Sequence, residues 1–283
     1  MTTTPLLVAY DGSVDARRAL TWSAEESLRT GSPVHVLAVD EVLPPGWGGV
    51  APAAVFTEGY VIDSSGLLEE AEGLLRAAGV TAVTTERRTG AVAAELVRAA
   101  GSAAAVVLGS RGHGPVGEAL IGSVSQHVAR HAPCPVVVVR EPRDPDARRI
   151  VVGVDGSPES SAALDHAFRR AEATGESVVA IHGVHVRAPS TDVWAAEPRT
   201  VDLAARERLL AEAVAGLRED HPDVVLEQEV VAVAPARCLA DASASASLVV
   251  VGSRGLGWFS GLLLGSVSQA VLQRATCPVA VVR

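Results

Sequence analysis

The stretch Gly109-Ser-Arg-Gly-His-Gly-Pro-Val-Gly-Glu-Ala-Leu-Ile-Gly-Ser-Val-Ser125 decides the fold and indicates one kind of site. It follows an apolar run, residues 103–108, that is typical of a buried strand, and a helical pattern starts at its end. Glycines let backbone amides approach a ligand, and a helix start offers unpaired N–H groups and a positive dipole end. This series predicts an anion-binding site; a set of tight turns is the alternative.

The same loop occurs twice in the chain. Residues 109–140 and 252–283 are identical at 19 of 32 positions, and an Asp-Gly-Ser tripeptide recurs 144 residues apart. A repeat of this length is a whole domain, so we predict domains at 1–143 and 144–283. The spacing Gly-x2-Gly-x9-Gly-Ser is formed first by Gly109, Gly112, Gly122 and Ser123, and then by Gly252, Gly255, Gly265 and Ser266.

Each copy alternates short apolar runs with amphipathic helical patterns. This alternation predicts an α/β fold: two tandem, doubly wound, Rossmann-like domains, each with a parallel sheet and right-handed crossovers. In copy one we expect strands near 5–10, 33–39, 80–87, 103–108 and 135–140, with helices near 14–29, 58–78, 91–101 and 122–131. In copy two we expect strands near 149–154, 177–184, 224–232, 247–251 and 278–283, with helices near 158–174, 200–219, 235–246 and 265–275.

The composition excludes several kinds of function. All 24 basic residues are arginine, so a Walker lysine, a Schiff-base lysine and a lysine base are excluded. The net charge of −9 is spread over both halves, which argues against a nucleic-acid partner. No apolar run has the roughly 18 residues of a membrane span, and the first residues do not resemble a signal peptide, so we expect a cytoplasmic protein without membrane contact. The three cysteines fit buried small hydrophobes.

Charged side chains beside the loops have two interpretations each. Asp11 and Asp155 follow the first strand of each copy, where an α/β sheet binds its ligands. Their carboxylates could accept hydrogen bonds from a ribose, or they could cap the helix that follows. Arg111 and Arg254 could pair with a phosphate or form a solvated salt bridge. His113, in the first loop, fits a loop histidine better than a catalyst, because no acid or serine is spaced to complete a triad.

These motifs resemble the universal stress protein family over the whole chain. They are the Asp-Gly-Ser after strand one, the Gly-x2-Gly-x9-Gly-Ser loop after strand four and a last strand Cys-Pro-Val-x-Val-Val. The loop is the mark of the ATP-binding branch of that family. The resemblance implies five strands per domain in the order 3-2-1-4-5, with two helices on each face. It also implies ATP and Mg²⁺ as ligands, with no residue ligating the metal.

The resemblance assigns roles residue by residue. Backbone at Ala38 and Gly183 would contact adenine, Asp11 and Asp155 would bind the ribose, and Gly109 and Gly252 would approach it. Two departures stand out: Ala38 and Gly183 are smaller than the family's usual valine, and Val233 replaces Gly90 beside strand three. We therefore expect unequal sites, with copy one the tighter. Phosphates would lie against Gly112, Gly122, Ser123, Val124 and Ser125 in copy one, and against Gly255, Gly265, Ser266, Val267 and Ser268 in copy two.

Three functions remain open at this point. The first is a stress-response regulatory protein with one ATP site per domain, which acts through nucleotide occupancy, binds an unidentified protein partner and could form a homodimer. The second is a slow ATPase or a nucleotidyl or phosphoryl transferase, although the absence of lysine argues against an enzyme. The third is a partner-binding dimer with vestigial sites.

Overall fold

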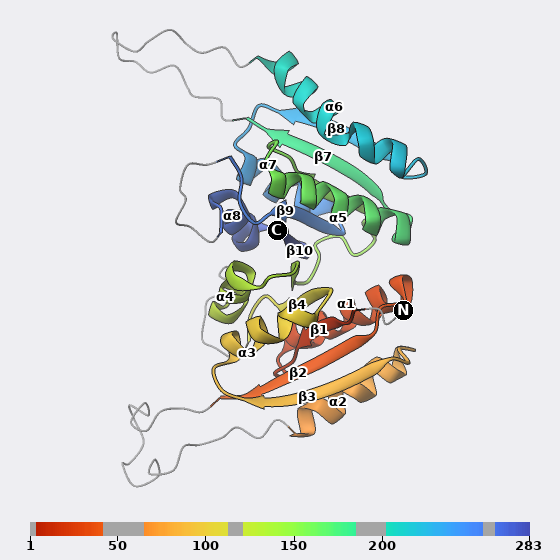
Figure 1. Ribbon diagram of the computed structural model, residues 1–283, viewed down its shortest axis with the longest axis vertical. Coiled ribbons are helices and arrows are strands. Elements are labelled where there is room, and N and C mark those ends of the chain that lie inside the picture. Colours follow the sequence, from red (N-terminus) through yellow and green to blue (C-terminus); the bar gives the residue numbers. More distant parts are fainter. Residues whose placement is uncertain (1–3, 42–64, 113–120, 185–201, 257–263) are drawn as a thin grey trace, which may run out of the picture. The chain divides into compact units, whose positions relative to one another are not determined.

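The computed structural model describes residues 4–41, 65–112, 121–184, 202–256 and 264–283. The chain forms two compact units, residues 1–140 and 141–283 (Figure 1), and the predicted boundary at 143/144 lies three residues beyond the division. The proline-rich segments 44–57 and 188–198, which hold Trp47 and Trp194, lie outside the described residues, and so does His113.

Unit 1 is a parallel sheet with helices packed on it. Its strand order is β3-β2-β1-β4-β5, and its pairs are parallel, as predicted. Helices α1 and α2 pack together, and α3 and α4 form a second pair. The elements are β1 (Leu6–Ala9), α1 (Val14–Thr30), β2 (Val34–Asp40), α2 (Ser65–Ala77), β3 (Val83–Thr89), α3 (Val92–Ala99), the 3-10 turn η1 (Ala100–Ser102), β4 (Ala105–Gly109), α4 (Ser123–His131) and β5 (Val136–Val139).

Unit 2 repeats this arrangement. Its strand order is β8-β7-β6-β9-β10, again with parallel pairs, so the order 3-2-1-4-5 is confirmed in both copies. The elements are β6 (Arg149–Gly153), α5 (Pro158–Thr174), β7 (Ser177–Gly183), α6 (Leu203–Asp220), β8 (Leu226–Val231), α7 (Pro235–Ala242), the 3-10 turn η2 (Ser243–Ser245), β9 (Leu248–Gly252), α8 (Ser266–Arg274) and β10 (Val279–Val282).

Local sequence signals set the ends of the first helix in each unit. Ser13 and Ser157 are the N-caps of α1 and α5, and their hydroxyls accept the N–H of Ala16 and Ser160. Both helices end at a glycine in the left-handed region, Gly31 with φ 72° and Gly175 with φ 68°. Glycine adopts this backbone without a steric cost, so the chain can turn directly into the next strand.

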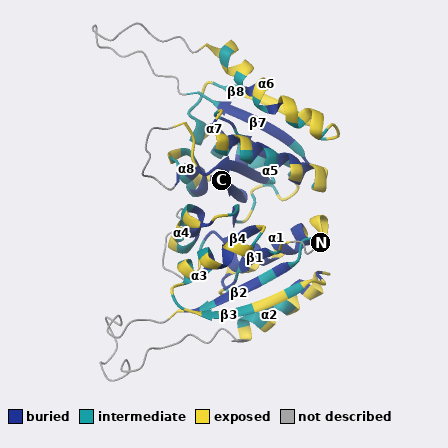
Figure 2. Cartoon of the chain, in the orientation of Figure 1, coloured by how far each residue is buried: buried dark blue, intermediate teal, exposed yellow. Residues whose placement is uncertain are grey.

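The core of each unit is largely aliphatic. Strands β4, β5, β9 and β10 are buried along their whole length, whereas every residue of β3 and β8 is partly or fully exposed (Figure 2). Cys238 and Cys277 are buried, but Cys134 is partly exposed. Among the described residues, no helix is long and apolar enough to cross a membrane.

Candidate functional site

Asp11 and Asp155 hold the turn between the first strand and the first helix. One carboxylate oxygen of each accepts the N–H of the N-cap serine, Ser13 or Ser157, at 2.9 Å. The N-cap of each helix is the serine and not the aspartate, so the prediction that the aspartate caps the helix is not met directly. The aspartate instead accepts the backbone N–H of the serine that caps. Each aspartate can accept further hydrogen bonds, because a carboxylate has about four lone-pair sites.

In unit 2 the aspartate also holds the glycine loop. The second oxygen of Asp155 accepts the N–H of Leu256 at 3.1 Å, and the hydroxyl of Ser157 donates to the first oxygen at 2.6 Å. Burial alone would raise the pKa of Asp155, but these hydrogen bonds outweigh it and hold the pKa below its ordinary value. Asp155 is therefore ionised at neutral pH.

The second glycine of each loop lies against the aspartate. A Cβ built on Gly112 would be 2.6 Å from Oδ2 of Asp11, and a Cβ on Gly255 would overlap Oδ2 of Asp155. Neither glycine has a positive φ, so glycine is needed here for space and not for backbone freedom. The loop and the aspartate thus form one packed group in both units.

Within the described residues, the helices that follow the loops begin without a side-chain cap. Gly122 and Gly265 are the N-caps of α4 and α8, and neither helix has an acidic residue in its first turn. The backbone N–H groups of these first turns and the positive dipole end are therefore available to an anion. The hydroxyls of Ser125 and Ser268 donate to the carbonyls of Gly109 and Gly252, at 2.7 and 2.5 Å, and so fix each helix to its strand.

The loop arginines pair with an acid on the first helix. Nε of Arg111 lies 3.2 Å from Oδ2 of Asp15, and Nε of Arg254 lies 3.3 Å from Oε1 of Glu159. The salt-bridge alternative is therefore correct for the structure as it stands. Sequence reasoning missed these acids, although they occupy the same place in both copies; an acid in the first turn was to be expected for the helix dipole alone.

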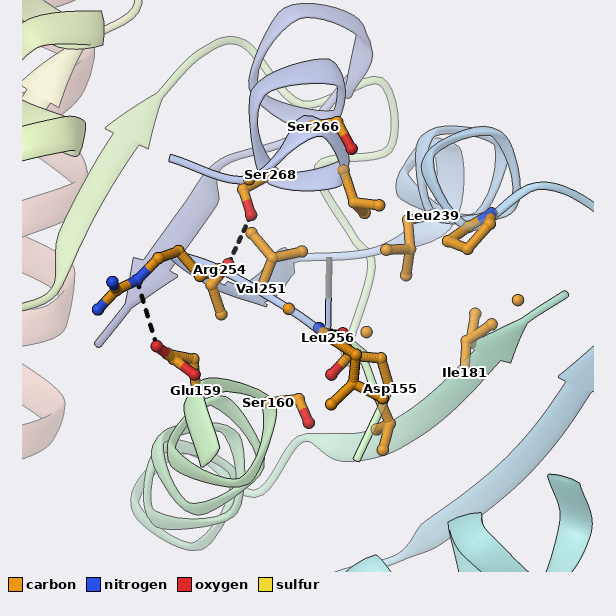
Figure 3. A pocket seen from close by; sticks show the side chains of 18 residues that line it. Asp155, Glu159, Ser160, Ile181, Leu239, Val251, Arg254, Leu256, Ser266 and Ser268 are labelled. Atoms are coloured by element: carbon orange, nitrogen blue, oxygen red, sulfur yellow. Dashed lines mark hydrogen bonds and ion pairs between the residues drawn. The ribbon is translucent and has the colours of Figure 1, made fainter. Parts of the chain in front are cut away.

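In unit 2 these groups surround one cavity of about 570 Å³. Figure 3 shows Arg254, Glu159 and Ser268 on one side of it and Ile181 and Leu239 on the other, with Ser266 between them at the top. A polar end and an apolar end in one cavity suit a ligand with both characters. The lining includes all nine residues that the sequence assigned to copy two, Asp155, Gly183, Gly252, Arg254, Gly255, Gly265, Ser266, Val267 and Ser268.

The strand register corrects one predicted equivalence. Ala9 pairs with Leu37 in unit 1, and its counterpart Gly153 pairs with Ile181 in unit 2. Gly183 therefore corresponds to Val39, and the prediction that it corresponds to Ala38 is wrong by one residue. Ile181 and Gly183 line the cavity of unit 2, and their counterparts in unit 1 are Leu37 and Val39. Side chains alternate along a strand, so the buried side chain of Ala38 lies on the opposite face of β2 from those of Leu37 and Val39. The error arose because neither strand has a landmark residue near its end.

The space beside Gly183 is already filled. A Cβ on Gly183 would lie 2.6 Å from Cα of Pro235 and 2.8 Å from Sγ of Cys238. The first turn of α7 therefore packs directly on the end of β7. Pro235 and Leu239 line the apolar end of the cavity, and Val233, which we expected beside the pocket, is not part of its lining.

Gly109 and Gly252 have a packing role that the sequence did not reveal. A Cβ on Gly109 would lie 2.6 Å from the carbonyl carbon of Asp15, and one on Gly252 would lie 2.8 Å from that of Glu159. The first turns of α1 and α5 thus rest on the ends of β4 and β9. The small residue brings the acid of each helix close to the loop arginine.

The architecture and the two loops identify the family. A family model described as "Universal stress protein family" matches residues 2–140 and 147–283, so the chain belongs to the universal stress protein family. A universal stress protein of Mycolicibacterium smegmatis is 36% identical over 289 residues, which cover 98% of this chain and 96% of that protein.

Solved structures have the same fold. The crystal structure of a universal stress protein from Archaeoglobus fulgidus has a TM-score of 0.71 and 20% identity, and the match covers 100% of this chain and 99% of that chain. A universal stress protein solved in complex with cAMP is 27% identical over 48% of this chain and 97% of that chain, with a TM-score of 0.38.

Proposed function

We propose that the chain binds ATP with Mg²⁺ at one site in each unit and acts as a cytoplasmic regulatory protein through nucleotide occupancy. The observation that carries the proposal is the cavity of unit 2, which gathers every residue that the sequence assigned to that copy. Unit 1 has the same loop, aspartate and uncapped helix, which supports a second site.

The two ends of the cavity suit the two ends of a nucleotide. Adenine would lie among Ile181, Pro235 and Leu239, where the lining is apolar. Asp155 would accept a hydrogen bond from a ribose hydroxyl at Oδ2, which accepts the N–H of Leu256 and has room for a second donor. Phosphates would lie against the first turn of α8, where the backbone N–H groups meet no side-chain cap.

The residues present also fit Mg²⁺ as a companion of the phosphates. Among the described residues, no group of three or more His, Cys, Asp or Glu side chains could hold a metal ion. Magnesium commonly binds through substrate phosphates with few protein ligands. The ion would lower the negative charge that the nucleotide brings to the loop.

The test is native mass spectrometry together with calorimetry. Protein that has been freed of nucleotide by unfolding and refolding should bind about two ATP per chain in the presence of Mg²⁺, and GTP should bind more weakly. Because occupancy is proposed as the signal, bound ATP should stay intact, with no repeated release of phosphate. A folded chain that gives no heat and no mass shift with ATP would contradict the proposal.

A further inference from the structure

The acid on the first helix differs between the units in how well its charge is compensated. In unit 1 the carboxylate of Asp15 is 7% exposed and accepts hydrogen bonds from Arg18 at 2.7 Å, Ser110 at 2.8 Å and Arg111 at 3.2 Å. Burial alone would raise the pKa of Asp15, but these partners outweigh it and keep the pKa low.

In unit 2 the corresponding acid faces the cavity. Glu159 is 22% exposed, it lines the cavity, and among the described residues its ion-pair partner is Arg254. The counterpart of Arg18 is Ala162, which has no charge. The hydroxyl of Ser253, the counterpart of Ser110, is buried and has no hydrogen-bond partner among the described residues. Glu159, which has a longer side chain than Asp15, therefore pairs with Arg254 (Figure 3) and makes no hydrogen bond to Ser253 among the described residues.

This difference affects what happens when a phosphate approaches. When Arg254 turns to a phosphate, its single positive charge is shared between the ligand and Glu159, whose carboxylate faces the same cavity. Arg111 can turn in the same way while Arg18 and Ser110 still compensate Asp15. The charged side chains that line the cavity of unit 2 are Asp155, Glu159 and Arg254, with a formal net charge of −1.

We propose that Glu159 determines ligand specificity in unit 2 by limiting the negative charge of the nucleotide that binds there. The inference rests on the proposed function and deepens it. Unit 1 takes free ATP, whereas unit 2 selects adenine ligands of lower charge, such as adenosine and AMP, or ATP whose charge is reduced by a divalent cation.

The test compares ATP, AMP and adenosine by calorimetry without a divalent cation, in a Gly112→Ala background that silences unit 1. Glu159→Gln should strengthen ATP binding by about tenfold and adenosine binding by less than about twofold, because the repulsion removed scales with ligand charge. High salt or Mg²⁺ should shrink the gain for ATP, which a purely structural effect would not do.

Two further variants make the outcome specific. Ala162→Arg keeps Glu159 and gives it the partner that Arg18 provides in unit 1, so it should shift the ATP-to-adenosine ratio in the same direction. Glu172→Gln removes a carboxylate of the same helix that pairs with His221, and it should leave the ratio unchanged.

The outcomes separate this inference from the proposed function. If the background variant binds no adenine ligand in unit 2 even with Mg²⁺, the proposed function fails there and the inference fails with it. If ATP binds but neither Glu159→Gln nor Ala162→Arg changes the ratio, the inference alone is overturned.

Discussion

Unit 1 and unit 2 hold the same loop against the same aspartate, but they surround it differently. Two tight contacts are the same in both units. The second glycine of each loop packs on the aspartate, and the glycine at the end of β4 or β9 packs on the first helix. The parts that differ are Val39 against Gly183, Arg18 against Ala162, and Glu95 against Cys238. The comparison teaches that the packing of the glycine loop on the aspartate is kept in both units, whereas the residues around it differ.

The largest effect should follow from adding a methyl group where the loop meets the aspartate. Gly255→Ala would force Asp155 out of position and remove ATP binding in unit 2, and Gly112→Ala would do the same in unit 1. We expect a loss of at least about 100-fold, or about 2.7 kcal/mol, at the altered site alone. Calorimetry should show the stoichiometry fall from two to one.

Two other glycines serve as controls for this prediction. Gly216, within α6, has no atom within 4 Å of a built Cβ, so Gly216→Ala should leave both sites intact. Gly122→Ala should cost less than Gly112→Ala, because its Cβ would lie 3.4 Å from the carbonyl oxygen of Ser110 and 3.5 Å from Cα of Arg111. Equal losses for Gly122→Ala and Gly112→Ala would contradict the steric account of the loop.

The second prediction concerns stability and not binding. Gly252→Ala and Gly109→Ala would push the first turn of α5 or α1 away from the sheet, because the nearest atoms belong to the backbone. Overpacking of this kind costs about 1–3 kcal/mol. Chemical denaturation should show one destabilised unit in each variant, and unchanged midpoints would mean that the helix can shift freely.

The third prediction is a difference in acid sensitivity between the units. The pKa of His166 is lowered to about 4, mainly by burial and further by the positive charges of Arg170 and Arg169. Unit 1 has Trp22 at the equivalent position, which does not titrate. The unfolded state binds this proton near pH 6.5, so unit 2 should lose stability as the pH falls from about 6.5 toward 4. Because His166 is partly exposed, we expect the free energy of unfolding of unit 2 to fall by about 1 kcal/mol between pH 7 and pH 5.

His166→Gln is the matched variant, since glutamine stays neutral at every pH. Thermal unfolding between pH 7 and pH 5 should show a weaker pH dependence for the variant than for the parent chain. The same slope in both would assign the acid sensitivity to other groups.

The smallest effect should come from Ser253, and Ser110, its counterpart in unit 1, provides the comparison. Ser110→Ala removes a hydrogen bond to the buried carboxylate of Asp15 and should cost about 1.5–3 kcal/mol when that bond counts fully, less if water replaces it. Ser253→Ala removes a buried hydroxyl that has no hydrogen-bond partner in the part of the chain that the structure describes, and it should change the stability of unit 2 by less than about 0.5 kcal/mol. The difference between the two variants, measured by denaturation, is the informative quantity. Equal costs would indicate that Ser253 has a partner after all.

Much of the fold was predictable because its signals are local and occur twice. The alternation of apolar runs and helical stripes predicted parallel α/β domains, the family resemblance implied the strand order, and the duplicated loop located the carboxyl ends of the strands. Parallel strands meet at one edge, so Asp155 and Gly255 had to lie close together although 100 residues separate them.

The rest depended on packing that no spacing reveals. A one-residue shift in register misassigned Ala38, because an apolar strand end has no landmark. The glycines at 109 and 252 were predicted as ligand contacts, and the sequence did not reveal that the backbone of a helix also lies against them. Glu159 was not among the predicted site residues, because its contact with Arg254 depends on where the first turn of α5 and the glycine loop come together in space.

The close packing of α7 on Gly183 has a consequence for any exchange of parts between the two units. Valine cannot be transplanted to position 183 alone, since Pro235 and Cys238 already occupy its volume. To copy the unit 1 residues into unit 2, the substitutions Gly183→Val, Pro235→Val and Cys238→Glu would have to be made together. The residues around the two sites can therefore diverge more readily by several substitutions made together than by one substitution at a time.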